Sequence, residues 1–169
     1  MVVELNEALK EVLQSKEYES FSKEHQGYYL AHGFIQLEGD FSGKKSWQIG
    51  FYSPENDNLG VFETQPVKFQ PLQDAFKDGG TISQLQDPKD FIPTETAISK
   101  IKKLLEEKHS HEVPHSGLII VQVINDIPVY NITIITAAFS MITTHINALT
   151  GELVKENKSS VLDLKKNEK

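Results

Sequence analysis

Three histidines occur within the short stretch HSHEVPH, residues 109–115. His109, His111 and His115, together with Glu112, supply imidazole and carboxylate groups that can bind zinc, copper or nickel. The stretch follows a predicted helix and precedes a predicted strand, so we expect a loop, where polar residues are common. The spacing therefore leaves two interpretations, a metal site or ordinary surface histidines. The second is favoured, and no cofactor is predicted.

Two other histidines lie in predicted strands. His32 follows a pair of tyrosines, and His145 is in a threonine-rich strand. Either imidazole could act as a general base beside a carboxylate. However, the sequence has neither a serine in a nucleophile-elbow pattern nor a glycine-rich phosphate loop before a helix. It also has no cysteine, which excludes thiolate chemistry and disulfides. The sequence therefore predicts a protein that is not an enzyme.

Aromatic residues are concentrated in the predicted strands of the first half: Trp47, Phe51, Tyr52, Phe62 and Phe69. Core packing is the favoured role for them. A helix covers only one face of a sheet, so a second sheet, a partner or a ligand must cover an apolar excess on the other. The candidate ligand or interface residues are therefore Trp47, Phe51, Phe62 and His145.

The charge of the chain bears on its partners. All 17 basic residues are lysines, and the formal net charge is −7. An acidic chain without arginine is a poor ligand for nucleic acid, so no nucleic-acid partner is predicted. Residues 1–20 are charged throughout, and no apolar run reaches the roughly 18 residues that a membrane helix needs. We therefore expect a soluble cytoplasmic protein with no membrane partner.

Periodicity predicts the secondary structure. Apolar residues at helical spacing from Leu5 to Leu13 predict a first helix, with a second short helix ending near Gly27. A longer helix is expected after Pro93, with Thr94 as its N-cap. Strands are predicted over 28–38, 46–52, 59–64, 67–72, 118–124, 129–136, 140–147 and 152–157.

The two halves repeat this order of elements. Residues 46–64 can be laid on residues 129–147 without a gap, although identity is low; a register that pairs 46–64 with the later hairpin is the alternative. The fold class predicted is α+β, with two tandem units that each pack a helix on an antiparallel sheet. The units are residues 1–72 and 94–162, joined by a connector at 73–93 and followed by a charged tail at 163–169.

The end of the second half resembles a known family. The stretch INALTGELV, residues 146–154, is similar to the last hairpin of PepSY and cystatin-like domains, and the likeness is strongest over 94–157. A glycine in such a turn suits a position with positive φ. The resemblance implies a helix packed on an antiparallel sheet. It also implies a module that restrains proteases or binds a partner.

Taken together, these features predict a non-enzymatic binding or protein-interaction module, acting on an unknown protein partner or as a homodimer. The alternative is a small-molecule-binding or weakly enzymatic domain. That alternative would use a pocket on a sheet face, with His32 or His145 in it.

Overall fold

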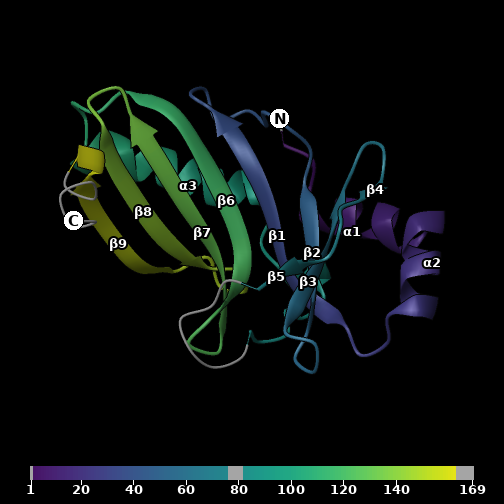
Figure 1. Ribbon diagram of the computed structural model, residues 1–169. Helices are drawn as coiled ribbons and strands as arrows, with labels where there is room; N and C mark the ends of the chain where they lie inside the picture. The colour runs from purple at the N-terminus through teal and green to yellow at the C-terminus, as the bar shows by residue number, and fades with distance from the viewer. Residues whose placement is uncertain (1, 76–81, 163–169) are drawn as a thin grey trace.

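The computed structural model describes residues 2–75 and 82–162. Within these residues the fold has three α-helices and a nine-stranded antiparallel sheet, and it is α+β as predicted (Figure 1). The helices are α1 (Leu5–Leu13), α2 (Lys16–Glu24) and α3 (Thr94–Lys108), with a short 3-10 turn, η1, at Pro88–Asp90. The strands of the first half are β1 (Tyr29–Glu38), β2 (Gln48–Ser53), β3 (Asn58–Glu63), β4 (Lys68–Phe69) and β5 (Gln73–Asp74). Those of the second half are β6 (Pro114–Ile124), β7 (Ile127–Thr136), β8 (Ser140–Asn147) and β9 (Leu153–Ser160).

The order of the strands joins the two halves. It runs β4-β3-β2-β1-β6-β7-β8-β9, and β5 pairs with β3. The strands of the first half thus extend outward from β1, and those of the second half extend outward from β6. The central contact is the antiparallel β1–β6 pair, in which Gly33 lies opposite Val121 and Ile35 opposite Ile119.

This arrangement differs from the expected pair of separate sheets. Each half does have its own helix and strands in the predicted order, but β1 and β6 hydrogen-bond edge to edge. In two separate sheets, the backbone N–H and C=O groups on these edges of β1 and β6 would be unpaired. Their pairing with each other satisfies these groups within the chain. The result is one continuous sheet rather than two.

All three helices cover the same face of the sheet. Leu5 of α1 lies against Gly33 of β1: a Cβ added to Gly33 would lie only 2.5 Å from Cδ1 of Leu5. Phe21 of α2 lies against Gly60 in the same way, at 2.7 Å. The apolar stripe of α3, which includes Ile98 and Ile101, joins the same core cluster. None of the described α-helices covers the opposite face of the sheet, and we call it the helix-free face.

The start of α3 differs from the prediction. Thr94 is the first residue of the helix and Pro93 occupies the N-cap position, with no side-chain cap of its own. The missing acceptor comes from Glu4, whose carboxylate accepts hydrogen bonds from the Thr94 backbone N–H and hydroxyl. The prediction of Thr94 as N-cap was wrong because a distant carboxylate supplies the cap.

The turn between β8 and β9 has the predicted glycine conformation. Gly151 has φ +78°, and its N–H donates to the Asn147 carbonyl oxygen. The Asn147 side chain accepts from the N–H groups of Leu149 and Thr150. An asparagine followed by a left-handed glycine thus ends β8 and starts β9.

The remaining segments are the connector and the tail. The connector is described over residues 73–75 and 82–93, and it contains β5 and η1. The predicted charged tail, 163–169, lies outside the described residues. Within the described part of the chain, no helix has the length and apolarity needed to cross a membrane.

Candidate ligand site on the helix-free face

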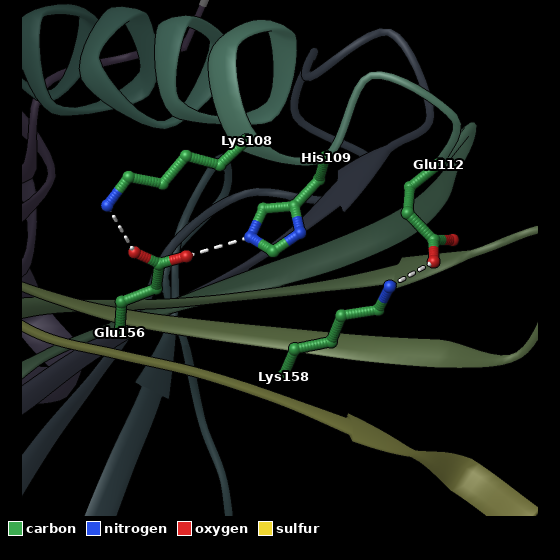
Figure 2. Close-up of polar contacts among 5 residues, drawn as sticks. All are labelled: Lys108, His109, Glu112, Glu156 and Lys158. Atoms are coloured by element: carbon green, nitrogen blue, oxygen red, sulfur yellow. Dashed lines mark hydrogen bonds and ion pairs between the residues drawn. The ribbon is translucent and has the colours of Figure 1, made fainter.

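The first predicted site, the histidine cluster, forms a polar network around the end of α3. His109 is the C-cap residue of α3, and its Nε2 lies 2.8 Å from a carboxylate oxygen of Glu156 in β9. The ammonium of Lys108 lies 3.3 Å from the other oxygen of Glu156 (Figure 2). The hydrogen bond to His109, followed by the contribution of Lys108, lowers the pKa of Glu156. His111 and His115 are exposed.

Glu112 belongs to the same network. Its carboxylate accepts from Lys158 of β9 at 2.8 Å, as Figure 2 shows, and from the Ser140 hydroxyl at 3.0 Å. Hydrogen bonds from Lys158, Thr136 and Ser140 lower the pKa of Glu112 to about 2. The network therefore ties edge strand β9 to the end of α3. Among the described residues, no group of histidine and carboxylate side chains has a metal-binding arrangement.

The three aromatic candidates belong to the core. Trp47, Phe51 and Phe62 are 1%, 3% and 0% exposed and face the helices. The indole N–H of Trp47 donates to the Val3 carbonyl oxygen, and the rings of Phe51 and Phe62 pack around Phe21. Core packing, the favoured interpretation of the sequence, accounts for all three, and none of them can reach a ligand on the surface.

The helix-free face contains a hollow of about 420 Å³ between the sheet and the connector. We call it the His32 hollow. It is lined by Ala31, His32, Phe34, Gln48, Leu59, Val61, Gln73, Asp74, Ile82, Ile120 and Gln122. These residues come from strands of both halves and from the connector. The Tyr29 hydroxyl donates to the Ile82 carbonyl oxygen, which holds the connector against β1 at this place.

Gly50 makes room for the His32 side chain. The two residues face each other across the β1–β2 pair, next to a register shift between Leu30 and His32. A Cβ on Gly50 would lie 2.1 Å from Cε1 of the imidazole and 2.5 Å from its Nδ1. Because no side chain fits there, the imidazole lies flat on the backbone of β2. The absence of a side chain at position 50 therefore determines where His32 sits.

His32 is uncharged at neutral pH. Burial lowers its pKa to about 4, since desolvation disfavours the imidazolium. None of the described residues forms a hydrogen bond or an ion pair with the His32 side chain. A neutral imidazole has one donor and one acceptor nitrogen, so His32 keeps hydrogen-bonding capacity for a group that enters the hollow.

The face continues from the hollow toward His145. Phe34 lies opposite Ile120, Ile120 opposite Asn131, and Asn131 opposite His145. Oδ1 of Asn131 is buried, and none of the described residues donates a hydrogen bond to it. The pKa of His145 is lowered by burial and then by the charge of Lys155. The two histidines that the sequence singled out therefore share one face, with two strands between theirs.

Several lining residues were missed by the sequence interpretation. Gln48 and Gln122 are ordinary strand residues, and nothing in their spacing distinguishes them. Their convergence depends on the β1–β6 pair, which brings residues from the two halves side by side. A usable signal was the alternation along 28–38, which places His32 and Phe34 on one face and Ile35 on the other.

The comparisons with known proteins give the fold alone. No family model matches the chain, and no curated protein matches it. A crystal structure of a "putative lipoprotein" from Clostridium difficile 630 is similar, with a TM-score of 0.50 and 13% sequence identity. The match covers 85% of this chain and 90% of that one. At this identity the likeness extends to the arrangement of helices and strands and not to a site.

Proposed function

We propose that this protein is a non-enzymatic binding module that holds a small ligand on the helix-free face, with the His32 hollow as the binding site. The observation that carries the proposal is the placement of His32. A desolvated imidazole lies in the space left by Gly50 and borders a hollow, and none of the described residues forms a hydrogen bond or an ion pair with it. Buried polar groups normally have partners, so a free one beside a hollow suits a ligand.

The size and lining of the hollow support a small ligand. Ligand pockets are typically about 300–1,000 Å³ and are mostly apolar with a few polar groups. The His32 hollow has about 420 Å³, and apolar residues such as Phe34 and Ile120 line it together with three glutamines and Asp74. None of its described lining residues carries a hydroxyl, thiol or amine nucleophile, which supports binding rather than covalent catalysis.

A protein partner or a second copy of the chain is the other candidate for this face. The observation that favours it is that half-buried apolar side chains extend beyond the hollow, among them Leu118, Ile135 and Met141. Such a surface suits a larger contact than a small molecule makes. Sedimentation velocity of the purified chain separates a monomer from a homodimer.

The tandem architecture is also a proposal. The outward strand order from β1 and from β6 supports two related units, and so does the gapless match of 46–64 with 129–147, which lays β2–β3 on β7–β8. The helix-on-sheet arrangement is compatible with the PepSY and cystatin-like resemblance. Profiles built separately for the two halves from related sequences should align over these ranges. A failure to align would contradict the duplication.

The location of the protein is proposed to be cytoplasmic, with neither nucleic-acid nor membrane partners. The lysine-only basic residues and the acidic balance support this. The solved structure with a similar fold carries a lipoprotein description, so cell fractionation is the appropriate test. Recovery of the protein in the membrane fraction would contradict the proposal.

A fragment screen by NMR tests the binding proposal. Small molecules are added to the isotope-labelled chain, and shifted resonances are mapped onto the structure. We expect hits that shift His32, Phe34 and Ile120 and that bind more weakly to the Phe34→Ala variant. Leu118→Ala is the matched control, because Leu118 is on the same face but outside the hollow. Hits that map only elsewhere, or that ignore Phe34→Ala, would contradict the proposal.

A further inference from the structure

A second hollow lies on the helix side of the sheet, between α3 and the strands β8 and β9. It has about 230 Å³, and its described lining residues belong to α3 and to residues 144–153. We call it the α3–β9 groove. The end of β9 is far from it, because Ser160 pairs with Ser140, and Ile146 of the groove lies about 20 Å further along β8. The groove is therefore separate from the His32 hollow, which lies on the other face.

The position of the groove follows from how β9 is held. Near the end of α3, His109 contacts Glu156 of β9 (Figure 2). Toward the start of β9, a register shift between His145 and Ile146 interrupts the pairing of β8 with β9. Such a shift bends a strand and redirects its side chains. Leu153, the partner of Ile146, thereby lines the hollow beside the helix.

Apolar side chains form the walls of the groove. Ile146 is buried, Leu104 of α3 is half-buried, and Leu153 at the rim is 48% exposed. An aliphatic chain placed between these side chains would remove apolar surface from water on both sides. The groove is smaller than the roughly 300–1,000 Å³ of a typical ligand pocket, so it suits a short chain.

Lys100 of α3 supplies a cation to the groove. Its side chain extends over Gly151, where an added Cβ would lie 3.2 Å from Cε and 3.7 Å from the ammonium nitrogen. The other charged residues of the described lining are Lys103 and Glu107, which lie 3.9 Å apart and offset each other's charge. One positive charge is therefore left beside the apolar walls, and a lysine ammonium can donate three hydrogen bonds.

We infer that the α3–β9 groove binds a small aliphatic carboxylate, with its carboxylate on the Lys100 ammonium and its chain between Leu104, Ile146 and Leu153. This inference goes beyond the proposed function, because it assigns a second site on the other face of the sheet. The lysine selects the charge of the ligand and the three apolar side chains select its body.

A matched pair of probes tests this inference. Octanoate and octylamine have the same aliphatic chain and carry opposite charges at pH 7. We expect octanoate to shift the resonances of Leu104, Ile146 and Leu153 in a saturable way, and to bind about fivefold or more tightly than octylamine. The readout is NMR titration of the full chain, with residue-specific shifts that report the place of binding.

Variants at Lys100 test the position of the carboxylate. Lys100 is exposed, so Lys100→Gln should fold, and it should weaken octanoate binding by about three- to fivefold without weakening octylamine. Lys102→Gln is the control. Lys102 is an exposed lysine of the same helix, but its ammonium lies 5.3 Å from the centre of the Phe41 ring, outside the groove.

Variants at Leu153 test the position of the chain. Leu153→Ser should weaken octanoate and octylamine alike by about threefold or more, because apolar contact is lost for both. Leu149→Ser is the control, since Leu149 is also exposed and lies outside the described lining of the groove.

The outcomes separate this inference from the proposed function. Octylamine that binds in the groove as tightly as octanoate, or equal effects of Lys100→Gln and Lys102→Gln, would overturn the role of Lys100. Failure of octanoate to shift Leu104, Ile146 and Leu153, or shifts confined to His32, Phe34 and Ile120, would overturn the groove as a site. None of these results decides the proposed function, which the fragment screen tests on the other face.

Discussion

The carboxylate of Glu4 caps helix α3 at Thr94, 90 residues further along the chain. One oxygen accepts the Thr94 backbone N–H at 2.9 Å and the hydroxyl at 2.9 Å, and the other lies 3.0 Å from the same N–H. The N–H of Val2 donates to Glu95 in the first turn of α3 at 2.7 Å. The N-terminal segment of the first half thus fixes the start of the helix that covers the second half.

This relationship predicts the effect of Glu4→Ala. Loss of a helix cap usually costs about 1–2 kcal/mol, and here a negative charge near the helix N-terminus is lost as well. We expect a decrease of that size in the free energy of unfolding, measured by urea denaturation. Glu7→Ala is the control, since Glu7 is exposed and lies 3.8 Å from Lys10 in a surface pair. Equal stabilities for the two variants would contradict the capping role.

Gly50→Ala should displace His32. The new Cβ would lie 2.1–2.7 Å from three imidazole atoms, far closer than van der Waals contact, so the ring must leave its place. Such overpacking typically costs about 1–3 kcal/mol. Gly43→Ala is the control, because its nearest neighbours lie at 3.4 Å and 3.6 Å, an ordinary contact.

The cause of that cost can be isolated by a double-mutant cycle. In a His32→Ala background the obstructing ring is absent, so Gly50→Ala should cost much less than in the natural chain. Stability from urea denaturation gives all four values. An equal cost in both backgrounds would show that the ring is not what Gly50 accommodates.

His32 also predicts a pH dependence of stability. Its pKa is about 4 in the fold and 6.5 in an unfolded chain, so the unfolded chain takes up the proton first as the pH falls. The stabilisation that the neutral imidazole gives to the fold is complete above about pH 6.5. It is lost between about pH 6.5 and 4, where the free energy of unfolding decreases by at most about 3 kcal/mol. The difference in stability between the natural chain and His32→Gln should change over this window. Parallel curves would contradict the burial of a neutral His32.

The ion pair of Glu112 and Lys158 should hold edge strand β9. Lys158→Met removes a 2.8 Å contact between β9 and the loop after α3, so β9 should open more often. We expect amide hydrogen exchange in β9 to become about three- to fivefold faster, with β7 unchanged. Lys155→Met is the control, because Lys155 is an exposed lysine of the same strand on the opposite face. Equal acceleration by both variants would assign the effect to the loss of any lysine.

Local patterns predicted most of the elements and few of their contacts. The apolar stripe of α1, the alternation in β1 and the Asn147–Gly151 turn follow from spacing and glycine conformation. The β1–β6 pair is different, because an amphipathic strand has the same pattern whether its edge is paired or free. The single sheet therefore could not be predicted from periodicity.

The candidate site shows the same limit. His32 and His145 attracted attention as histidines in strands, but their shared face depends on cross-strand register. Gly50 gave no signal, since its role arises only when it lies opposite His32. The cluster His109, His111 and His115 was conspicuous in the sequence, yet its first member binds Glu156 and the other two are exposed. Spacing along the chain indicates local chemistry, whereas partners from distant strands depend on the fold.

The most direct test of the ligand site follows the ring nitrogens of His32 by long-range ¹H–¹⁵N NMR during titration with the strongest hit of the fragment screen. We predict a saturable shift of the His32 nitrogens, with those of the exposed His111 and His115 unchanged. Movement of the exposed histidines with His32 unchanged, or no movement of any ring at saturating probe, would contradict a ligand site at His32.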